Sequence, residues 1–216
     1  LRLPGHFANG RADVQRAAIN SNGTLAGWVA TAALTRARGA ALVVVNNGFI
    51  YAIAGETTGS VVTDVAEFAR VNVDGTLGTW TVTQNAPLGL GGTTASGSAT
   101  NGFLYASRGN GSPVVWVAPF LSNGHLGSFW NTTSLAIGRD GHATAAYNGI
   151  LYATGGWSGV FRDDVVYAPL LAPMARGFYS KLVTPSPGWM GTFDSILATG
   201  TSSANEGSRA APFLGA

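Results

Sequence analysis

The side chains best suited to chemistry in this chain are an arginine, a histidine and a tryptophan in one short stretch. Arg139 precedes the segment DGHATAAYNGILYATGGWSG, which contains His142 and Trp157. A catalytic histidine needs a nucleophile or an acid placed beside it. The spacing supplies no such partner. His6, His125 and His142 also occupy different positions in the surrounding pattern, so we predict no metal site.

The composition excludes several other kinds of chemistry and partner. Cysteine is absent, so the chain can form neither disulfides nor thiolate metal sites. The formal net charge is +2, and the single lysine and the arginines are scattered, so no basic run matches a line of phosphates and nucleic acid is not an expected partner. No apolar run approaches the roughly 20 residues that span a bilayer, and we expect no transmembrane segment.

The elements that must position these side chains are short strands joined by turns. The chain contains 31 glycines and only 10% charged residues, and it is rich in Thr, Val, Asn and Ser. Such a composition favours strands and turns over long helices, which indicates an all-β protein. A surface with few charges and many Gly, Thr and Asn residues favours a secreted or cell-surface location.

An internal repeat organises the first three quarters of the chain. Three segments that begin near Asp13, Asp64 and Val114 each contain a strand-like run, a turn with glycine, a leucine and then a tryptophan. We interpret these tryptophans as packing residues at equivalent positions: Trp28, Trp80 and Trp130. One tryptophan in each repeat is more typical of a core than of a binding site.

A second unit alternates with the first. It has two β-rich runs joined by Asn-Gly, followed by two apolar residues and a tyrosine: Tyr51, Tyr105 and Tyr152. Asn-Gly between such runs is the strongest short signal for a hairpin. Two hairpins in a repeat of about 50 residues predict four strands, at 39–46, 49–55, 64–71 and 77–83 in the first complete copy. Stacking such sheets around an axis buries both of their faces, which describes a β-propeller.

The best-preserved copy, LAIGRDGHATAAYNGILYATGGWSGVFRDDVVYAPL, resembles the kelch repeat in its bacterial-type form. The residues that match the family pattern are Arg139, His142, Gly149, Leu151, Tyr152, Gly155, Gly156, Asp164, Val165 and Tyr167. The resemblance covers roughly Asp13 to Leu170. It implies that Arg139 and His142 form a structural pair whose hydrogen bonds tie neighbouring loops. A copper site like that of galactose oxidase would need a Cys–Tyr crosslink and is excluded.

The resemblance also implies a ring of six or seven blades, whereas this chain supplies about three and a half. Residues 1–170 are expected to form the blades. Residues 171–216 are expected to hold a last strand at 177–183, a linker and the start of a further β module or a mobile tail. More blades before Leu1, assembly of several chains, or the tail itself would complete the ring.

Function in a propeller is expected on the loops at its two faces. The loops that join the two hairpins of a blade share one face with the loops that join successive blades. That face should collect the candidate ligand-binding residues Trp157, Arg162, Arg108, Asn110, Arg36, Arg38 and Glu56. Tryptophan can stack on a sugar ring, and arginine can bind carboxylates in a bidentate way, so a glycan or a protein is the expected partner.

The sequence therefore predicts a non-catalytic binding or structural module without cofactor or metal, of an adhesin-like or lectin-like kind. Two alternatives remain open. The chain could be a self-assembling structural subunit that forms homo-oligomers. It could also be a fragment of a carbohydrate-active propeller enzyme whose catalytic residues lie outside this chain.

Overall fold

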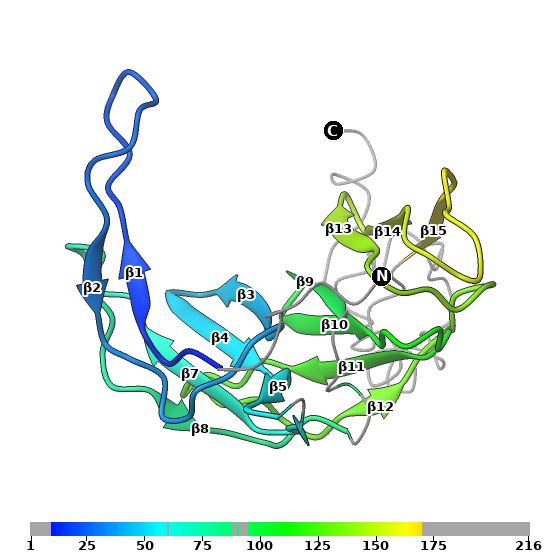
Figure 1. Ribbon diagram of the computed structural model, residues 1–216, viewed down its shortest axis with the longest axis horizontal. Helices are drawn as coiled ribbons and strands as arrows, with labels where there is room; N and C mark the ends of the chain where they lie inside the picture. The colour runs from blue at the N-terminus through cyan, green and yellow to red at the C-terminus, as the bar shows by residue number, and fades with distance from the viewer. Residues whose placement is uncertain (1–9, 60, 88–89, 91–94, 170–216) are drawn as a thin grey trace, which may run out of the picture. The chain divides into compact units, whose positions relative to one another are not determined.

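The computed structural model describes residues 10–59, 61–87, 90 and 95–169, and these residues form an all-β structure without a helix (Figure 1). The chain divides into two units, residues 1–169 and 170–216, and only the first contains described residues. The expected strand at 177–183 and the linker and tail after it lie outside the described residues. Within the described part of the chain, no helix is long and apolar enough to cross a membrane.

Two sheets have four antiparallel strands each, in the order predicted from two consecutive hairpins. The first sheet contains β3 (Leu42–Asn46), β4 (Phe49–Ile53), β7 (Ala66–Arg70) and β8 (Thr81–Val82). The second sheet contains β9 (Ser96–Thr100), β10 (Phe103–Ser107), β11 (Val115–Pro119) and β12 (Trp130–Asn131). The last strand of each sheet is only two residues long and pairs with its neighbour at two positions.

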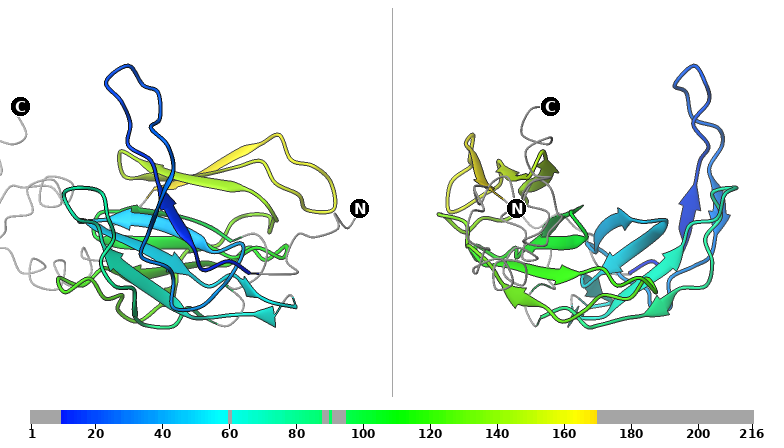
Figure 2. Two further views of the ribbon diagram at one scale, coloured as in Figure 1. Left: turned by 60° about the vertical axis from the view of Figure 1, so that its left-hand side comes forward. Right: turned by 180° about the vertical axis from the view of Figure 1, so that it is seen from behind.

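Three smaller sheets accompany them. The third sheet has three described strands: β13 (Ala143–Tyr147), β14 (Ile150–Thr154) and β15 (Val165–Pro169). β1 (Val14–Arg16) and β2 (Val29–Thr31) form a two-stranded sheet, and the loop between them extends well beyond these strands (Figure 2). β5 (Glu56–Thr57) and β6 (Val61–Val62) form a short hairpin between β4 and β7.

The Asn-Gly pairs make the predicted tight turns. Asn47, Asn101 and Asn148 have φ values of 46°, 51° and 52°, and the glycines after them have φ values of 74° to 77°. Two successive positive φ values are the requirement of a type I′ turn, whose twist matches that of the flanking strands. Each turn therefore sets the register of the hairpin that contains it.

Successive sheets pack face to face. The main core joins Leu42, Val44, Tyr51 and Phe68 of the first sheet to Leu104 and other residues of the second. Tyr51 also donates a hydrogen bond from its hydroxyl group to the carbonyl oxygen of Gly124, at 2.9 Å, in the β11–β12 turn. Burial raises the pKa of Tyr51 to about 12, because the ionised phenolate would be poorly solvated there. This contact ties the two sheets together.

The opposite face of the first sheet is covered by the two-stranded sheet and the loop after it. Trp80 is 5% exposed and packs on Ala52 and Ala69, with Val14 and Leu34 beside it. Its indole nitrogen Nε1 donates to the carbonyl oxygen of Ala32, at 2.9 Å. The contacts agree with a packing role for this tryptophan.

The strand register corrects one of the predicted tryptophan equivalences. Thr81 pairs with Phe68 and Trp130 pairs with Val117, and these two partners occupy the same position in β7 and β11. Phe129, one residue earlier, is therefore the counterpart of Trp80. Both residues lie three positions after the turn leucine, whereas Trp130 lies four positions after Leu126. Trp130 instead packs edge-on against Phe103, with ring centroids 6.0 Å apart.

Trp80 and Trp28 lie at the same repeat position, three residues after the turn leucine, but only Trp80 is buried, at 5% exposed against 63%. We expect Trp80→Ala to lower the free energy of unfolding by about 3–5 kcal/mol, because it leaves a cavity between two sheets. Trp28→Ala should change it by no more than about 0.5 kcal/mol. Chemical denaturation of both variants measures the difference, and equal losses would contradict the packing described here.

Candidate functional site

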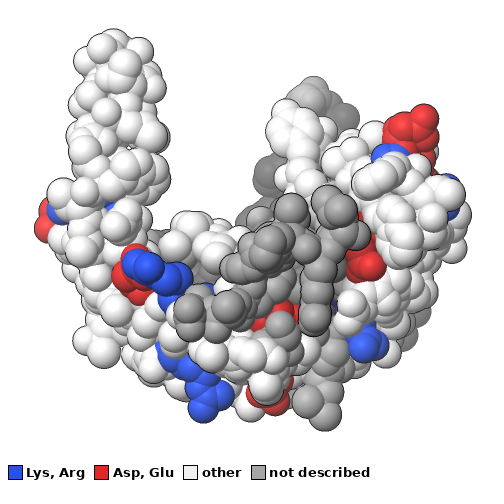
Figure 3. Space-filling view, in the orientation of Figure 1, with Lys and Arg blue, Asp and Glu red and all other residues white. Residues whose placement is uncertain are grey.

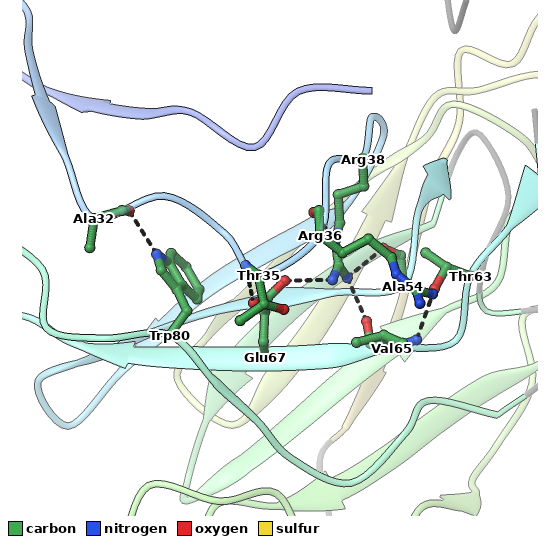
Figure 4. Close-up of polar contacts among 9 residues, drawn as sticks. All are labelled: Ala32, Thr35, Arg36, Arg38, Ala54, Thr63, Val65, Glu67 and Trp80. Atoms are coloured by element: carbon green, nitrogen blue, oxygen red, sulfur yellow. Dashed lines mark hydrogen bonds and ion pairs between the residues drawn. The ribbon is translucent and has the colours of Figure 1, made fainter. Parts of the chain in front are cut away.

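Arg38, a predicted ligand-binding residue, is occupied by contacts inside the protein (Figure 4). Its guanidinium group donates to the carbonyl oxygens of Ala54 and Val65, at 3.2 and 2.6 Å, and pairs with Glu67 at 2.5 Å. The side chains of Arg38 and Glu67 are 1% and 0% exposed. Glu67 also accepts a hydrogen bond from the backbone nitrogen of Thr35, at 2.9 Å. This pair links the loop before β3 to β7 and is not available to a ligand.

Arg139 occupies the matching position before β13 and makes similar contacts. It donates to the carbonyl oxygen of Gly155, at 3.0 Å, and to both carboxylate oxygens of Asp164, at 2.9 and 3.1 Å. These hydrogen bonds hold the pKa of the Asp164 carboxyl group below its usual value. The acidic partner differs between the two sheets, because Glu67 lies within β7 whereas Asp164 lies just before β15.

His142 contacts Ser107 of the second sheet, with 2.5 Å between Nε2 and Oγ, and both side chains are buried. The hydroxyl group of Ser107 also donates to the carbonyl oxygen of Ser96, at 3.1 Å. The contact therefore joins β10 of the second sheet to the residue just before β13 of the third sheet.

The loop after β14 contains two predicted candidates, Trp157 and Arg162, and exposes large apolar side chains beside them. Trp157 bridges to Asp140 and to Phe161, so that the loop folds into a small hairpin. Trp157, Val160 and Phe161 are 48%, 61% and 90% exposed. Arg162 follows them, and its backbone nitrogen donates to the carbonyl oxygen of Gly156, at 2.9 Å. An exposed tryptophan and phenylalanine beside an arginine can stack on rings and bind carboxylates.

Gly156, the second of two glycines before this hairpin, allows its close approach to the segment that precedes β13. Gly155 and Gly156 have φ values of 65° and 93°. A Cβ atom on Gly156 would lie 2.5 Å from the carbonyl oxygen of Asp140, so only glycine fits there. In the first sheet Ala54 and Gly55 occupy these positions, and Ala54 adopts a φ of 56° although it carries a side chain.

The remaining predicted ligand residues differ in their accessibility. Arg36 and Asn110 are exposed, Arg108 is half-buried, and Glu56 is only 6% exposed.

Next to Asn110, the backbone nitrogen of Gly111 donates to the carboxylate of Asp140, at 2.9 Å, which brings the loop of the second sheet against that of the third. On the face seen in Figure 3, charged side chains lie in small separate groups among uncharged ones.

The tyrosines predicted to be structural have different environments. Tyr51 and Tyr105 are buried, and burial raises the pKa of the Tyr105 hydroxyl group as it does for Tyr51. Tyr152 is half-buried and packs against Tyr167, with ring centroids 6.3 Å apart. The residues that the structure describes contain no group of three or more His, Cys, Asp or Glu side chains that could hold a metal ion.

Sequence reasoning missed Val160 and Phe161. Both follow Gly159 in a short segment between the Gly155-Gly156 pair and Asp163-Asp164. Two large apolar residues in a loop bounded by glycines and acidic residues were a usable signal, because loops in soluble proteins rarely expose contiguous apolar side chains without a function.

We expect Glu67→Gln to lower the free energy of unfolding by about 3–5 kcal/mol, because it leaves the charge of Arg38 buried without a countercharge. Asp13→Asn is the matched control, because it breaks the exposed pair with Arg11 and should leave stability nearly unchanged. Urea denaturation measures both. A Glu67→Gln variant as stable as the control would contradict the structural role of the buried pair.

The buried imidazole of His142 should make stability depend on pH. Burial, and next the nearby charge of Arg139, lower its pKa below 6.5, although Asp140 opposes this shift. Below about pH 6.5 the unfolded chain therefore binds a proton that the folded chain excludes. The free energy of unfolding should fall with decreasing pH, by up to about 1.4 kcal/mol per pH unit. Denaturation at several pH values should show this slope in the native chain and in His125→Gln, and its loss in His142→Gln.

Comparisons with known proteins show similarity at the level of fold. No protein-family model matches the sequence, and no curated protein matches it either. Among solved structures, the chain is similar to the one titled "Structure of YjhT", with a TM-score of 0.55 and 15% sequence identity. The match covers 68% of this chain and 47% of that chain, so this chain spans about half the length of the structure it resembles.

Proposed function

We propose that the chain forms kelch-like blades of a β-propeller and acts as a non-catalytic binding module of a secreted or cell-surface protein. Support for the propeller comes from the repeated four-stranded sheets, from their face-to-face packing and from the similarity to YjhT. A fold of this kind hosts many functions, so the binding role has to be argued from the side chains.

The exposed hairpin of Trp157, Val160 and Phe161 carries the proposal. The other two sheets have the buried Glu56 and the exposed Asn110 at the position of Trp157, so the repeat does not require an aromatic residue there. Aromatic rings with an adjacent arginine are typical of recognition sites for sugars and for protein surfaces. The partner we propose is therefore a glycan or a protein that meets the loop face.

A non-catalytic role is supported by how the reactive side chains are used. Arg38 and Arg139, which the repeat places at equivalent positions, form internal ion pairs that hold a loop to its own sheet. His142 contacts Ser107 and so joins the third sheet to the second.

A second candidate function, self-assembly, is favoured by one face of the third sheet. Tyr147, Val165 and Tyr167 are 76%, 59% and 70% exposed. The residues at the positions of Val165 and Tyr167 in the first sheet are Ala66 and Phe68, which lie in the core. Such a face is suited to cover by another copy of the chain.

The binding proposal is tested with a glycan array and with pull-down from extracellular fractions, using the native chain and Trp157→Ala. We expect a ligand whose affinity falls at least about tenfold in the variant, because central aromatic residues dominate binding energy. Trp28→Ala removes a tryptophan of similar exposure and should leave the affinity unchanged. Binding that is equally strong in Trp157→Ala, or turnover of a sugar without any binding partner, would overturn the proposal.

A further inference from the structure

The short β5–β6 hairpin, which follows β4, exposes two neighbouring apolar side chains. Val61 and Val62 are 60% and 47% exposed. Val62 pairs with Glu56 of β5, and at the same position of the third sheet Phe161 bridges to Trp157. The first and third sheets therefore present matching apolar pairs in the same loop: Val61 and Val62 in one, and Val160 and Phe161 in the other.

Both apolar pairs lie at the same end of their sheets. Each follows the second strand of an Asn-Gly hairpin and so lies at the end opposite to the Asn-Gly turns. Neighbouring sheets are joined at this end, because Ser107 contacts His142 and the backbone nitrogen of Gly111 donates to Asp140. In the left view of Figure 2, the cyan β5–β6 hairpin and the yellow loop after β14 extend towards the same side. The loop face thus presents two apolar pairs with the second sheet between them, since β9 contacts both β3 and β13.

Hydrogen bonds within each loop hold the apolar pairs in place. The hydroxyl group of Thr57 donates to the carbonyl oxygen of Val61, at 3.1 Å. In the third sheet, the backbone nitrogen of Ser158 donates to the carbonyl oxygen of Val160, at 3.0 Å. Because these loops are already folded, binding through them costs little ordering of the chain.

Arginines without a carboxylate partner lie on the same face. Arg36, in the loop before β3, is exposed, and Arg108, directly after β10, is half-buried. Neither forms an ion pair with any residue that the structure describes. Asp164 is already bound to Arg139, and Asp163 is the exposed carboxylate of the described loops after β4, β10 and β14. The face therefore combines apolar side chains with a small excess of positive charge.

We propose that the loop face docks on the surface of a lipid bilayer. The two apolar pairs enter the boundary between the headgroups and the acyl chains, and Arg36 and Arg108 meet anionic headgroups. Attachment at a membrane surface strengthens with the apolar area that is buried and with the attraction of basic side chains to anionic lipids.

A bilayer suits these observations better than a sugar or a folded protein. Valine side chains offer neither a ring that stacks on a sugar nor a hydrogen bond to its hydroxyl groups. Apolar pairs on two separate loops suit a fluid surface, which receives each of them without a matching pocket. The inference does not rest on the glycan or protein binding proposed above, because the variants that test it leave Trp157 unchanged.

Flotation of the full chain with lipid vesicles tests the proposal. We expect the native chain to float with vesicles of phosphatidylglycerol and phosphatidylcholine. Val62→Asp should weaken this binding at least about tenfold, because it places a charge where an apolar side chain meets the acyl chains. The matched control is Val73→Asp, at a fully exposed residue of the turn after β7, which lies at the opposite end of the same sheet. It should bind as the native chain does.

Thermal unfolding of both variants verifies that they are folded. No binding of the native chain to the vesicles, or an equal loss in the two variants, would overturn the proposal.

The arginines of the loop face should contribute only when the vesicles are anionic. Arg36→Gln should weaken binding to the phosphatidylglycerol vesicles about fivefold, because a basic side chain near an anionic surface adds that much affinity. Arg70→Gln removes an exposed arginine at the far end of β7 and should leave binding unchanged. Equal effects of the two substitutions would refute the proposed orientation.

The absence of cysteine allows a single fluorophore to be placed on the face. An environment-sensitive fluorophore attached to Val160→Cys should shift its emission to the blue when the anionic vesicles are added, because it leaves water for the acyl region. The same fluorophore on Val73→Cys should show no shift. A dimer in solution that Val62→Asp dissociates, without any vesicle binding, would contradict the proposal and assign the face to a second copy of the chain.

Discussion

Burial of both faces of each small sheet is the constraint on which the rest of this structure depends. A three- or four-stranded sheet with apolar residues on both faces is not stable alone in water, and its neighbours must cover it. Tyr51 and Phe68 meet one neighbour while Trp80 meets the other. The alanines at Ala52 and Ala69 matter as much as the aromatic residues, because their small size makes the space that an indole ring occupies.

The polar groups at the junctions follow from the same constraint. Loops that connect successive sheets bring arginine and histidine side chains into places that water cannot reach. Buried charges are tolerated there only when they are paired and hydrogen-bonded. Arg38 meets this condition with Glu67, and Arg139 meets it with Asp164. Arginine and histidine side chains are candidates for reactive groups, but here their contacts stabilise the fold.

What then distinguishes the third sheet is which of its side chains are exposed. Its loop carries Trp157 and Phe161, where the first sheet has the buried Glu56 and the short β5–β6 hairpin. One of its faces presents Tyr147 and Tyr167 to solvent, and its other face borders a groove of about 200 Å³ at Leu151. Departures from a repeat are where function is most readily sought, because packing alone does not require them.

The sequence by itself was sufficient for the all-β class, the Asn-Gly turns and the four-strand order, because these depend on local backbone preferences and on alternation of residue types. It also proposed Trp157 and Arg162 as candidate ligand residues, did not include Phe161, and assigned the internal Arg38 to ligand binding. The tertiary structure alone decided that Trp80 is buried while Trp28 is exposed, that Phe129 and not Trp130 is the counterpart of Trp80, and that Arg38 pairs with Glu67. These outcomes depend on which residues folding brings into contact. The residues adjacent to a side chain in the sequence do not indicate which sheet will pack against it.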